Sequence, residues 1–275
     1  MAQSINPEGQ GKQTASTQVV PDPKLNISLY VDGSGSMLGY VQSRDSYYGE
    51  ALKTLGDILA LDRGLRAIKP EVSYFRIGQE NPAIDRSGFR QAELPGFYDG
   101  TNPGFPEVSS PIHEAIKPPS GDKDLDNLIV IVTDLEQDDG DVTKLTSNLQ
   151  QHYLNQDKRY AVGVWAVKSE FAGKIYLNNT QGGLQARNYD TTAQTSDRYR
   201  PFYVLFVGPT ADVAHYFEKI AAKTPDLTNG SQGYLTLFPS DRLTEPLISL
   251  NEPKEMGGNL TQPDLITGKG GCGGK

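Results

Sequence analysis

Residues 25–40, LNISLYVDGSGSMLGY, place an apolar segment directly before a turn that carries one carboxylate and two hydroxyls. Within residues 25–31, branched apolar side chains alternate with polar or aromatic ones, which predicts a β-strand. The strand ends at Asp32, and Ser34 and Ser36 follow on a turn spaced by glycines. We expect these glycines to adopt backbone angles that other residues resist, so that the three side chains converge. An all-oxygen set with little charge is typical of a site for a hard divalent cation such as Mg²⁺.

The sequence of this turn, DGSGS, resembles the DxSxS signature of the von Willebrand factor A (vWA) domain family with its metal-ion-dependent adhesion site (MIDAS). That family adds a hydroxyl from a second loop and an aspartate from a third. Residues 110–116, SPIHEAI, are similar to the family's TPLxEAL segment, with Ser110 in place of Thr. Residues 127–133, NLIVIVT, predict a buried strand that leads to Asp134, the counterpart of the TDG aspartate, with Leu135 in place of the glycine.

The resemblance implies a metal site for Mg²⁺, with Mn²⁺ or Ca²⁺ as alternatives. Its implied ligands are Asp32, Ser34, Ser36, Ser110 and Asp134.

Two features of the second loop leave alternatives open. Thr101 is a rival to Ser110, but Thr101 is followed by Pro103, Gly104 and Pro106 and not by an apolar helix face. Ser110 is also a candidate N-cap for a short helix over residues 111–117, because a proline that suits the first helical position follows it. Ligation and capping are compatible at a junction between a loop and a helix.

The apolar patterns predict a single α/β domain. They indicate strands at residues 25–31, 72–77, 127–133, 160–167 and 202–207, and helices at residues 44–66, 142–154 and 211–223. This alternation predicts a doubly wound, mostly parallel sheet flanked by helices, which is the Rossmann-like fold that the resemblance also implies. Ligands of such sheets bind at the carboxyl ends of the strands, where Asp32 and Asp134 fall.

The resemblance covers residues 24–223. Before it, residues 1–23 are polar and predict a disordered leader, while residues 251–275 predict a disordered tail rich in Gly and Pro. Between them, residues 224–250 are expected to extend the sheet or to form a small annex, with possible strands at 233–238 and 242–250.

Two long polar insertions, residues 78–109 and 168–200, interrupt the domain. Long loops are often functional, and the first runs directly into Ser110. Its candidates for the rim of a binding site are Tyr98, Asp99, Thr101, Asn102, Phe105 and Glu107.

Acidic residues cluster after Asp134. Their spacing does not match an EF-hand, and we interpret them as acids at the positive end of the helix over residues 142–154. They are Glu136, Asp138, Asp139 and Asp141.

Composition excludes several classes of partner. The chain has 275 residues and a net charge of −8, so it carries no basic stripe for nucleic acid. No apolar run approaches the roughly 18 residues that cross a bilayer. The single cysteine, Cys272, leaves the redox compartment open. A cytoplasmic location is the default expectation, and an extracytoplasmic one remains open because a polar leader also follows a removed signal peptide or lipid anchor.

Three functions are compatible with these patterns. The resemblance implies a binding module, in which an Asp or Glu of a protein partner completes the coordination of the metal. A scaffold or regulatory subunit with a structural metal, for example a partner of an AAA+ ATPase, is the alternative. A Mg²⁺-dependent hydrolase is less favoured, because the sequence contains no GxSxG, GxxxxGK[ST] or HExxH motif, and we therefore expect no enzyme.

Overall fold

The structure is a computed structural model that describes residues 23–43, 45–122, 125–136, 142–156, 160–178 and 184–240. Its strands are β1 (Lys24–Asp32), β2 (Glu71–Ile77), β3 (Ala83–Ile84), β4 (Leu125–Thr133), β5 (Tyr160–Ser169), β6 (Ala172–Asn178), β7 (Leu184–Asp190), β8 (Arg200–Pro209) and β9 (Gly233–Pro239). Its α-helices are α1 (Tyr47–Leu61), α2 (Arg86–Gln91), α3 (Val142–Leu149) and α4 (Thr210–Lys223). Shorter helical turns are η1 (Gly35–Val41), η2 (Pro95–Phe97), η3 (Ile112–Ala115), η4 (Gln150–Leu154), η5 (Ser196–Arg198) and η6 (Pro225–Leu227).

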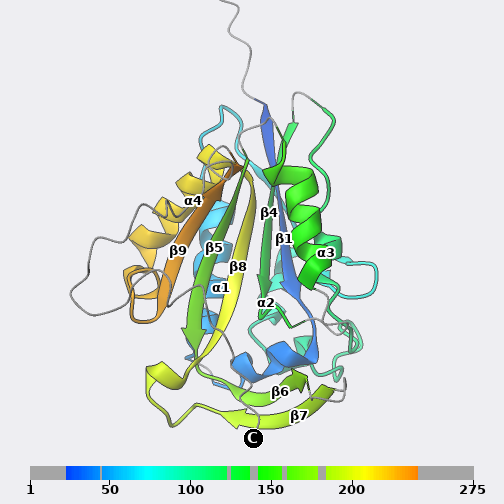
Figure 1. Cartoon of the computed structure of the whole chain (residues 1–275), viewed down its shortest axis with the longest axis vertical. Helices are drawn as coiled ribbons and strands as arrows, with labels where there is room; N and C mark the ends of the chain where they lie inside the picture. Colours follow the sequence, from blue (N-terminus) through cyan, green and yellow to red (C-terminus); the bar gives the residue numbers. More distant parts are fainter. Residues whose placement is uncertain are drawn as a thin grey trace, which may run out of the picture.

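Seven strands form one mixed sheet in the order β3-β2-β1-β4-β8-β5-β9 (Figure 1). The central strand β1 pairs in parallel with β2 and β4. The other pairs, β2–β3, β4–β8, β5–β8 and β5–β9, are antiparallel. The α/β class predicted from the sequence is therefore confirmed.

The prediction of a mostly parallel sheet is wrong, and strand β8 is the reason. A parallel strand needs a crossover connection, usually a helix, whereas antiparallel neighbours need only a hairpin. The chain between β5 and β8 forms the β6–β7 hairpin and returns beside β5, so that β8 lies antiparallel to both β5 and β4. The 168–200 segment, predicted as a loop insertion, is thus partly a two-stranded sheet.

Helices cover both faces of the seven-stranded sheet (Figure 1). Helices α1 and α4 pack on the face that carries the buried side chains of Leu25, Ile27 and Leu29. Helix α3 and the turns η3 and η4 pack on the opposite face, which carries Tyr30 and Ile131. The alternation of β1 residues between two apolar cores is what a strand buried on both faces requires.

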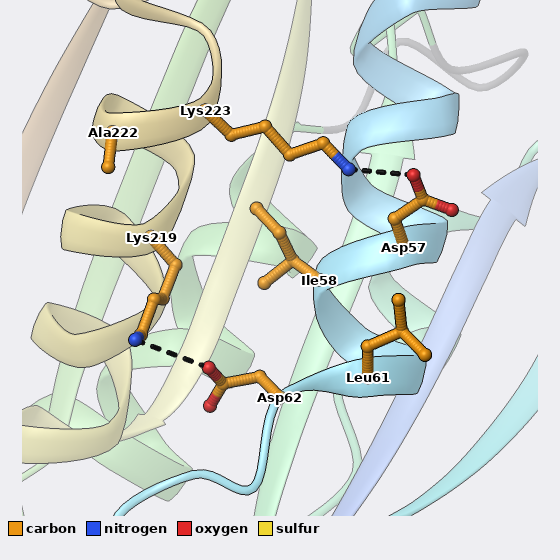
Figure 2. Close-up of a pocket in the computed structure, with 7 residues that line it drawn as sticks. All are labelled: Asp57, Ile58, Leu61, Asp62, Lys219, Ala222 and Lys223. Atoms are coloured by element: carbon orange, nitrogen blue, oxygen red, sulfur yellow. Dashed lines mark hydrogen bonds and ion pairs between the residues drawn. The ribbon is translucent and has the colours of Figure 1, made fainter.

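Helix α1 begins at Tyr47 because the side chain of Ser46 accepts a hydrogen bond from Gly49 N. It ends at Leu61, several residues before the predicted end of this helix at residue 66. Leu65 is 52% exposed and does not continue the buried face. At this end of the helix, a cleft of about 400 Å³ separates α1 from α4, and acidic and basic side chains face one another across it (Figure 2).

The 78–109 segment contains β3, α2 and η2, and the buried Arg76 guanidinium fastens it to the sheet. Arg76 donates to the carbonyl oxygens of Gly33, Phe97 and Pro106 at 2.8–2.9 Å. Tyr98, predicted at the rim of the site, is 1% exposed and shares a hydrogen bond with Tyr48 in the core.

The β6–β7 hairpin lies across the end of the sheet where β1 and β4 finish (Figure 1). It rests on η1, which begins within the DGSGS sequence and contains Ser36. Its approach to η1 is close, because a Cβ atom at Gly39 would lie 2.4 Å from the ring of Phe171. A Cβ atom at Gly173 would lie 2.9 Å from the Cα of Gly39. Glycine at both positions therefore allows the hairpin to contact the turn.

The strand predicted at residues 233–238 is β9, which extends the sheet beside β5. The predictions for residues 1–22, for a strand at 242–250 and for a tail at 251–275 lie outside the described residues. None of the described helices combines the length and apolarity needed to cross a bilayer.

Candidate metal centre

Asp32 is the last residue of β1, and its side chain is fully buried. One carboxylate oxygen, Oδ2, accepts a hydrogen bond of 2.7 Å from Thr133 Oγ1 at the end of the neighbouring strand β4. The other, Oδ1, accepts a hydrogen bond of 3.0 Å from the backbone N of Ser34. These bonds fix the carboxylate at the edge of the sheet.

Ser34, Ser36 and Asp134 lie beside Asp32 and are joined by hydrogen bonds. The Oγ atoms of Ser34 and Ser36 are 3.0 Å apart, and Ser36 Oγ donates to Asp134 Oδ1 at 3.2 Å. Since β1 and β4 are adjacent and parallel, their carboxyl ends meet, and the residues that follow them come together. The structure thus groups four of the five predicted ligands in one buried network.

The expectation that the glycines adopt unusual backbone angles is wrong, because neither Gly33 nor Gly35 has a positive φ. Glycine at position 33 instead makes room for a neighbour, since a Cβ atom there would lie 2.5 Å from Arg76 Nε. The strained position is Leu135, whose φ is 61°. Hydrogen bonds from Leu135 N to Thr133 Oγ1 and from Glu136 N to Asp134 Oδ1 hold this conformation.

Ser110 lies at the start of η3 and is 2% exposed. Its hydroxyl is among the groups that lower the pKa of Asp32, so it lies close to that carboxylate. Within the described residues, however, Ser110 Oγ makes no hydrogen bond of normal length and angle, so its contact with Asp32 is at best a weak one. The predicted capping role is wrong, because Pro111 occupies the N-cap position of η3 and no side chain caps this turn. Thr101 is exposed, and its hydroxyl donates to Asp99.

The charges of the two carboxyl groups are only partly compensated by their protein neighbours. Burial raises the pKa of Asp32, and hydrogen bonds from Ser34 and Thr133 offset this only in part. Burial, the charge of Asp32 and the charge of Glu136 raise the pKa of Asp134 to about 7, while Arg200 lowers it. Two buried carboxylates in contact with one network favour either a proton or a cation between them.

Sequence reasoning missed Arg200, the first residue of β8. Its Nη2 donates to Asp134 Oδ2 at 3.1 Å and also to Glu136 Oε1. Glu136 is therefore an ion-pair partner of Arg200 and not a helix-terminal acid as predicted, while Asp138, Asp139 and Asp141 lie outside the described residues. An antiparallel assignment for β8 would have placed Arg200 at this edge of the sheet. Thr133, the donor to Asp32, was also missed.

With this geometry established, we compared the chain with known proteins. No family model, curated protein or solved structure matches it. Membership of the vWA family therefore stays a prediction from the residues.

The chemistry of the donor set fits a hard divalent cation. Two carboxylates and three hydroxyls offer only oxygen ligands, as Mg²⁺, Mn²⁺ and Ca²⁺ prefer. Ser110 Oγ provides a buried oxygen that lacks a partner. Within the described segments, no group of three or more His, Cys, Asp or Glu residues is placed to hold a metal ion.

Proposed function

We propose that this chain is a metal-dependent protein-binding module with a vWA-like site. Asp32 and Asp134 would supply negative charge to a divalent cation, and Ser34, Ser36 and Ser110 would supply neutral oxygens. The cation, when bound, would supply a position that accepts an Asp or Glu carboxylate of a partner protein. The unpartnered, buried hydroxyl of Ser110 beside Asp32 carries this proposal, because a buried polar atom without a partner is destabilising unless a ligand satisfies it.

The charge balance of the ligand set supports the binding role. Three of the five oxygens would come from neutral serines, so an ion held by this set keeps much of its positive charge. An incoming carboxylate would therefore gain a strong electrostatic interaction. The chain itself has a net charge of −8, so a partner with an acidic contact needs such a local cation to offset general repulsion.

The backbone at Leu135 also supports the resemblance. The family that the sequence resembles has glycine at this position, and Leu135 has the left-handed backbone conformation that glycine adopts readily, with φ of 61°. Strands β1 and β4 are adjacent and parallel, and four of the proposed ligands lie at or just after their carboxyl ends, while Ser110 comes from the segment before η3. The antiparallel β8 departs from the compact pattern predicted for this family.

One observation favours the second candidate, a scaffold or regulatory subunit with a structural metal. The five proposed ligand residues are between 0% and 7% exposed. A partner's carboxylate would have to reach an ion surrounded by nearly buried side chains. The two candidates differ in whether partner binding requires the metal.

Metal binding is the first test. We expect isothermal titration calorimetry with MgCl₂ and MnCl₂ to detect binding to the wild-type protein and none to Asp32→Asn, which preserves the shape of a fully buried side chain. Asp57→Asn is the matched control, because Asp57 lies on α1, outside the proposed site, and its contact with Lys223 is exposed. Absence of binding of Mg²⁺, Mn²⁺ and Ca²⁺ to the folded wild-type protein would exclude both candidates.

Partner binding is the second test. Wild-type and Asp32→Asn baits are incubated with extract of the source cells in Mg²⁺ or in EDTA. The binding module predicts proteins that are retained by the wild-type bait in Mg²⁺ and lost both in EDTA and with Asp32→Asn. Equal retention in EDTA would contradict the binding role and favour the scaffold.

A further inference from the structure

Arg200 places a fixed positive charge against the proposed metal site. Its guanidinium Nη2 lies 3.1 Å from Asp134 Oδ2 and also donates to Glu136 Oε1. The side chain of Arg200 is 13% exposed, and that of Asp134 is fully buried. The contact is therefore screened only weakly by solvent.

Two groups outside the ligand set hold Arg200 in place. Its Nε donates to the hydroxyl of Tyr40 at 3.0 Å, and Tyr40 in turn donates to the carbonyl oxygen of Pro201 at 2.6 Å. The guanidinium carbon lies 4.8 Å from the centre of the Phe171 ring, within range of a cation–π contact. Arg200 is thus positioned by η1 and by the segment before β6, independently of any metal.

Both oxygens of Asp134 are already engaged. Oδ1 accepts from Ser36 Oγ and Glu136 N, and Oδ2 accepts from Arg200. A divalent ion bound through Asp134 must share a carboxylate with the guanidinium or replace it there. Two cations on one buried carboxylate repel each other strongly at the low effective dielectric of such a site.

Glu136 offers an alternative partner for Arg200. Its Oε1 already accepts from the guanidinium, while its Oε2 is buried and has no hydrogen-bond partner within the described residues. Arg200 can therefore leave Asp134 and still keep its ion pair with Glu136. In that state, Glu136 Oε2 can accept a second N–H group of the guanidinium.

We propose that Arg200 is an internal counter-cation that competes with the divalent ion for Asp134 and so weakens and regulates the affinity of the metal site. When the ion binds, Arg200 pairs with Glu136 alone; when the ion leaves, Arg200 returns to Asp134 and neutralises it. This inference rests on the proposed function, since it concerns regulation of the same site.

The test compares the metal affinity of the wild-type protein, Arg200→Gln and Arg200→Lys by calorimetry with MnCl₂ and MgCl₂. We expect Arg200→Gln to bind Mn²⁺ at least tenfold more tightly than the wild type, because the competing charge is gone. Arg200→Lys retains the charge but not the planar guanidinium, and we expect it to bind Mn²⁺ less tightly than Arg200→Gln. Arg198→Ala is the matched control. It also removes one positive charge, two residues before Arg200, but Arg198 is exposed and pairs with the exposed Asp197.

Thermal unfolding gives a readout besides affinity. In EDTA, Arg200→Gln should unfold at a lower temperature than the wild type, because Asp134 and Glu136 lose their cation. Added Mg²⁺ should raise the unfolding temperature of Arg200→Gln by more than that of the wild type. Equal or weaker Mn²⁺ binding by folded Arg200→Gln would overturn the inference and leave Arg200 as a residue that only positions Asp134.

A structure of the wild-type protein with Mn²⁺ keeps the inference testable even if Arg200→Gln fails to fold. We expect Arg200 to contact Glu136 and to lie beyond hydrogen-bond distance of Asp134 Oδ2. A retained bond to Asp134 beside a bound ion would contradict the competition. Wild-type protein that binds no metal would exclude the proposed function itself, whereas wild-type binding without a gain in Arg200→Gln would exclude only this inference.

Discussion

Ser110 is the residue whose environment depends most on the proposed metal. A buried hydroxyl without a hydrogen bond destabilises a protein by about 1–3 kcal/mol relative to a satisfied one. The Oγ of Ser110 is in this situation within the described residues, whereas those of Ser34 and Ser36 bond to each other. A cation beside Asp32 would satisfy this oxygen.

We predict that Ser110→Ala separates metal binding from stability. In EDTA the free energy of unfolding should stay within about 1 kcal/mol of the wild type or rise, because no hydrogen bond is lost. The affinity for Mn²⁺ should fall at least tenfold. Calorimetry and urea denaturation measure the two quantities.

Thr101→Ala is the control for this prediction, because Thr101 is the rival ligand and is exposed. It should leave the affinity for Mn²⁺ unchanged. The opposite pattern, with affinity lost in Thr101→Ala and kept in Ser110→Ala, would assign the second-loop ligand to Thr101.

At the scale of elements, helices α1 and α4 are linked by charges around the cleft in Figure 2. Asp62, which follows α1, contacts His215 Nε2 at 2.6 Å and Lys219 at 3.5 Å. Burial alone would raise the pKa of Asp62, but hydrogen bonds from His215 and from Gly64 N hold it below the ordinary value. The ion pair of Asp57 with Lys223 completes the link.

A lowered pKa in the folded state means that ionised Asp62 stabilises the protein above the pKa of the unfolded chain, near 4. This stabilisation is lost as the pH falls through the lower folded value. We predict that Asp62→Asn reduces the free energy of unfolding by about 1 kcal/mol at pH 7, and that the deficit shrinks below pH 4. Urea denaturation at pH 7, 5 and 3.5 measures the difference.

Asp57→Asn serves as the comparison, because its contact with Lys223 is exposed and screened by solvent. It should change stability by much less than Asp62→Asn. A deficit for Asp62→Asn that is equally large at pH 7 and pH 3.5 would show that the carboxylate charge is not the cause.

At the scale of the whole molecule, one buried guanidinium connects the sheet, the metal-site turn and the 78–109 segment. Arg76 belongs to β2 and is 2% exposed. It donates to the carbonyl oxygen of Gly33 in the turn and to those of Phe97 and Pro106 in the 78–109 segment. Its guanidinium carbon also lies 5.1 Å from the centre of the Phe97 ring. Burial lowers the pKa of Arg76, and the three acceptors of its Nη2 compensate for the lost hydration only in part, because Nε has no hydrogen-bond partner within the described residues.

We predict that Arg76→Ala lowers the free energy of unfolding by about 2–4 kcal/mol, since it leaves several buried carbonyl groups unsatisfied. The 78–109 segment should become more sensitive to limited proteolysis. Metal affinity should also weaken, because Gly33 of the site turn loses its anchor. Arg90→Ala removes an exposed arginine of the same segment and should leave stability, proteolysis and metal affinity unchanged. If the rate of proteolysis is the same in Arg76→Ala as in the wild type, the anchoring role is refuted.

The sequence allowed prediction of β1, β2, β4, β5, β8 and β9, because alternation and apolar runs are local signals, whereas β3, β6 and β7 lie in segments that were predicted as loops. Strand β4 and the position of Asp134 after it follow from residues 127–133 alone. The direction of β8 was mispredicted. The segment between β5 and β8 has no helical pattern, and the lack of a crossover helix was the available signal for an antiparallel strand. Arg200 could not be placed without that direction. The free hydroxyl of Ser110 depends on distances between loops, which no local pattern encodes.

The pairing of β5 with β8 brings the two ends of the segment between these strands together. Ser169 and Arg200 face each other in register, so residues 170–199 leave the sheet and return to the same place. The entropy of closing such a loop changes slowly with its length. Substitution of residues 172–190 by a segment of another length would therefore keep the pairing of β5 with β8, provided that the buried side chains of Phe171 and Thr191 are retained.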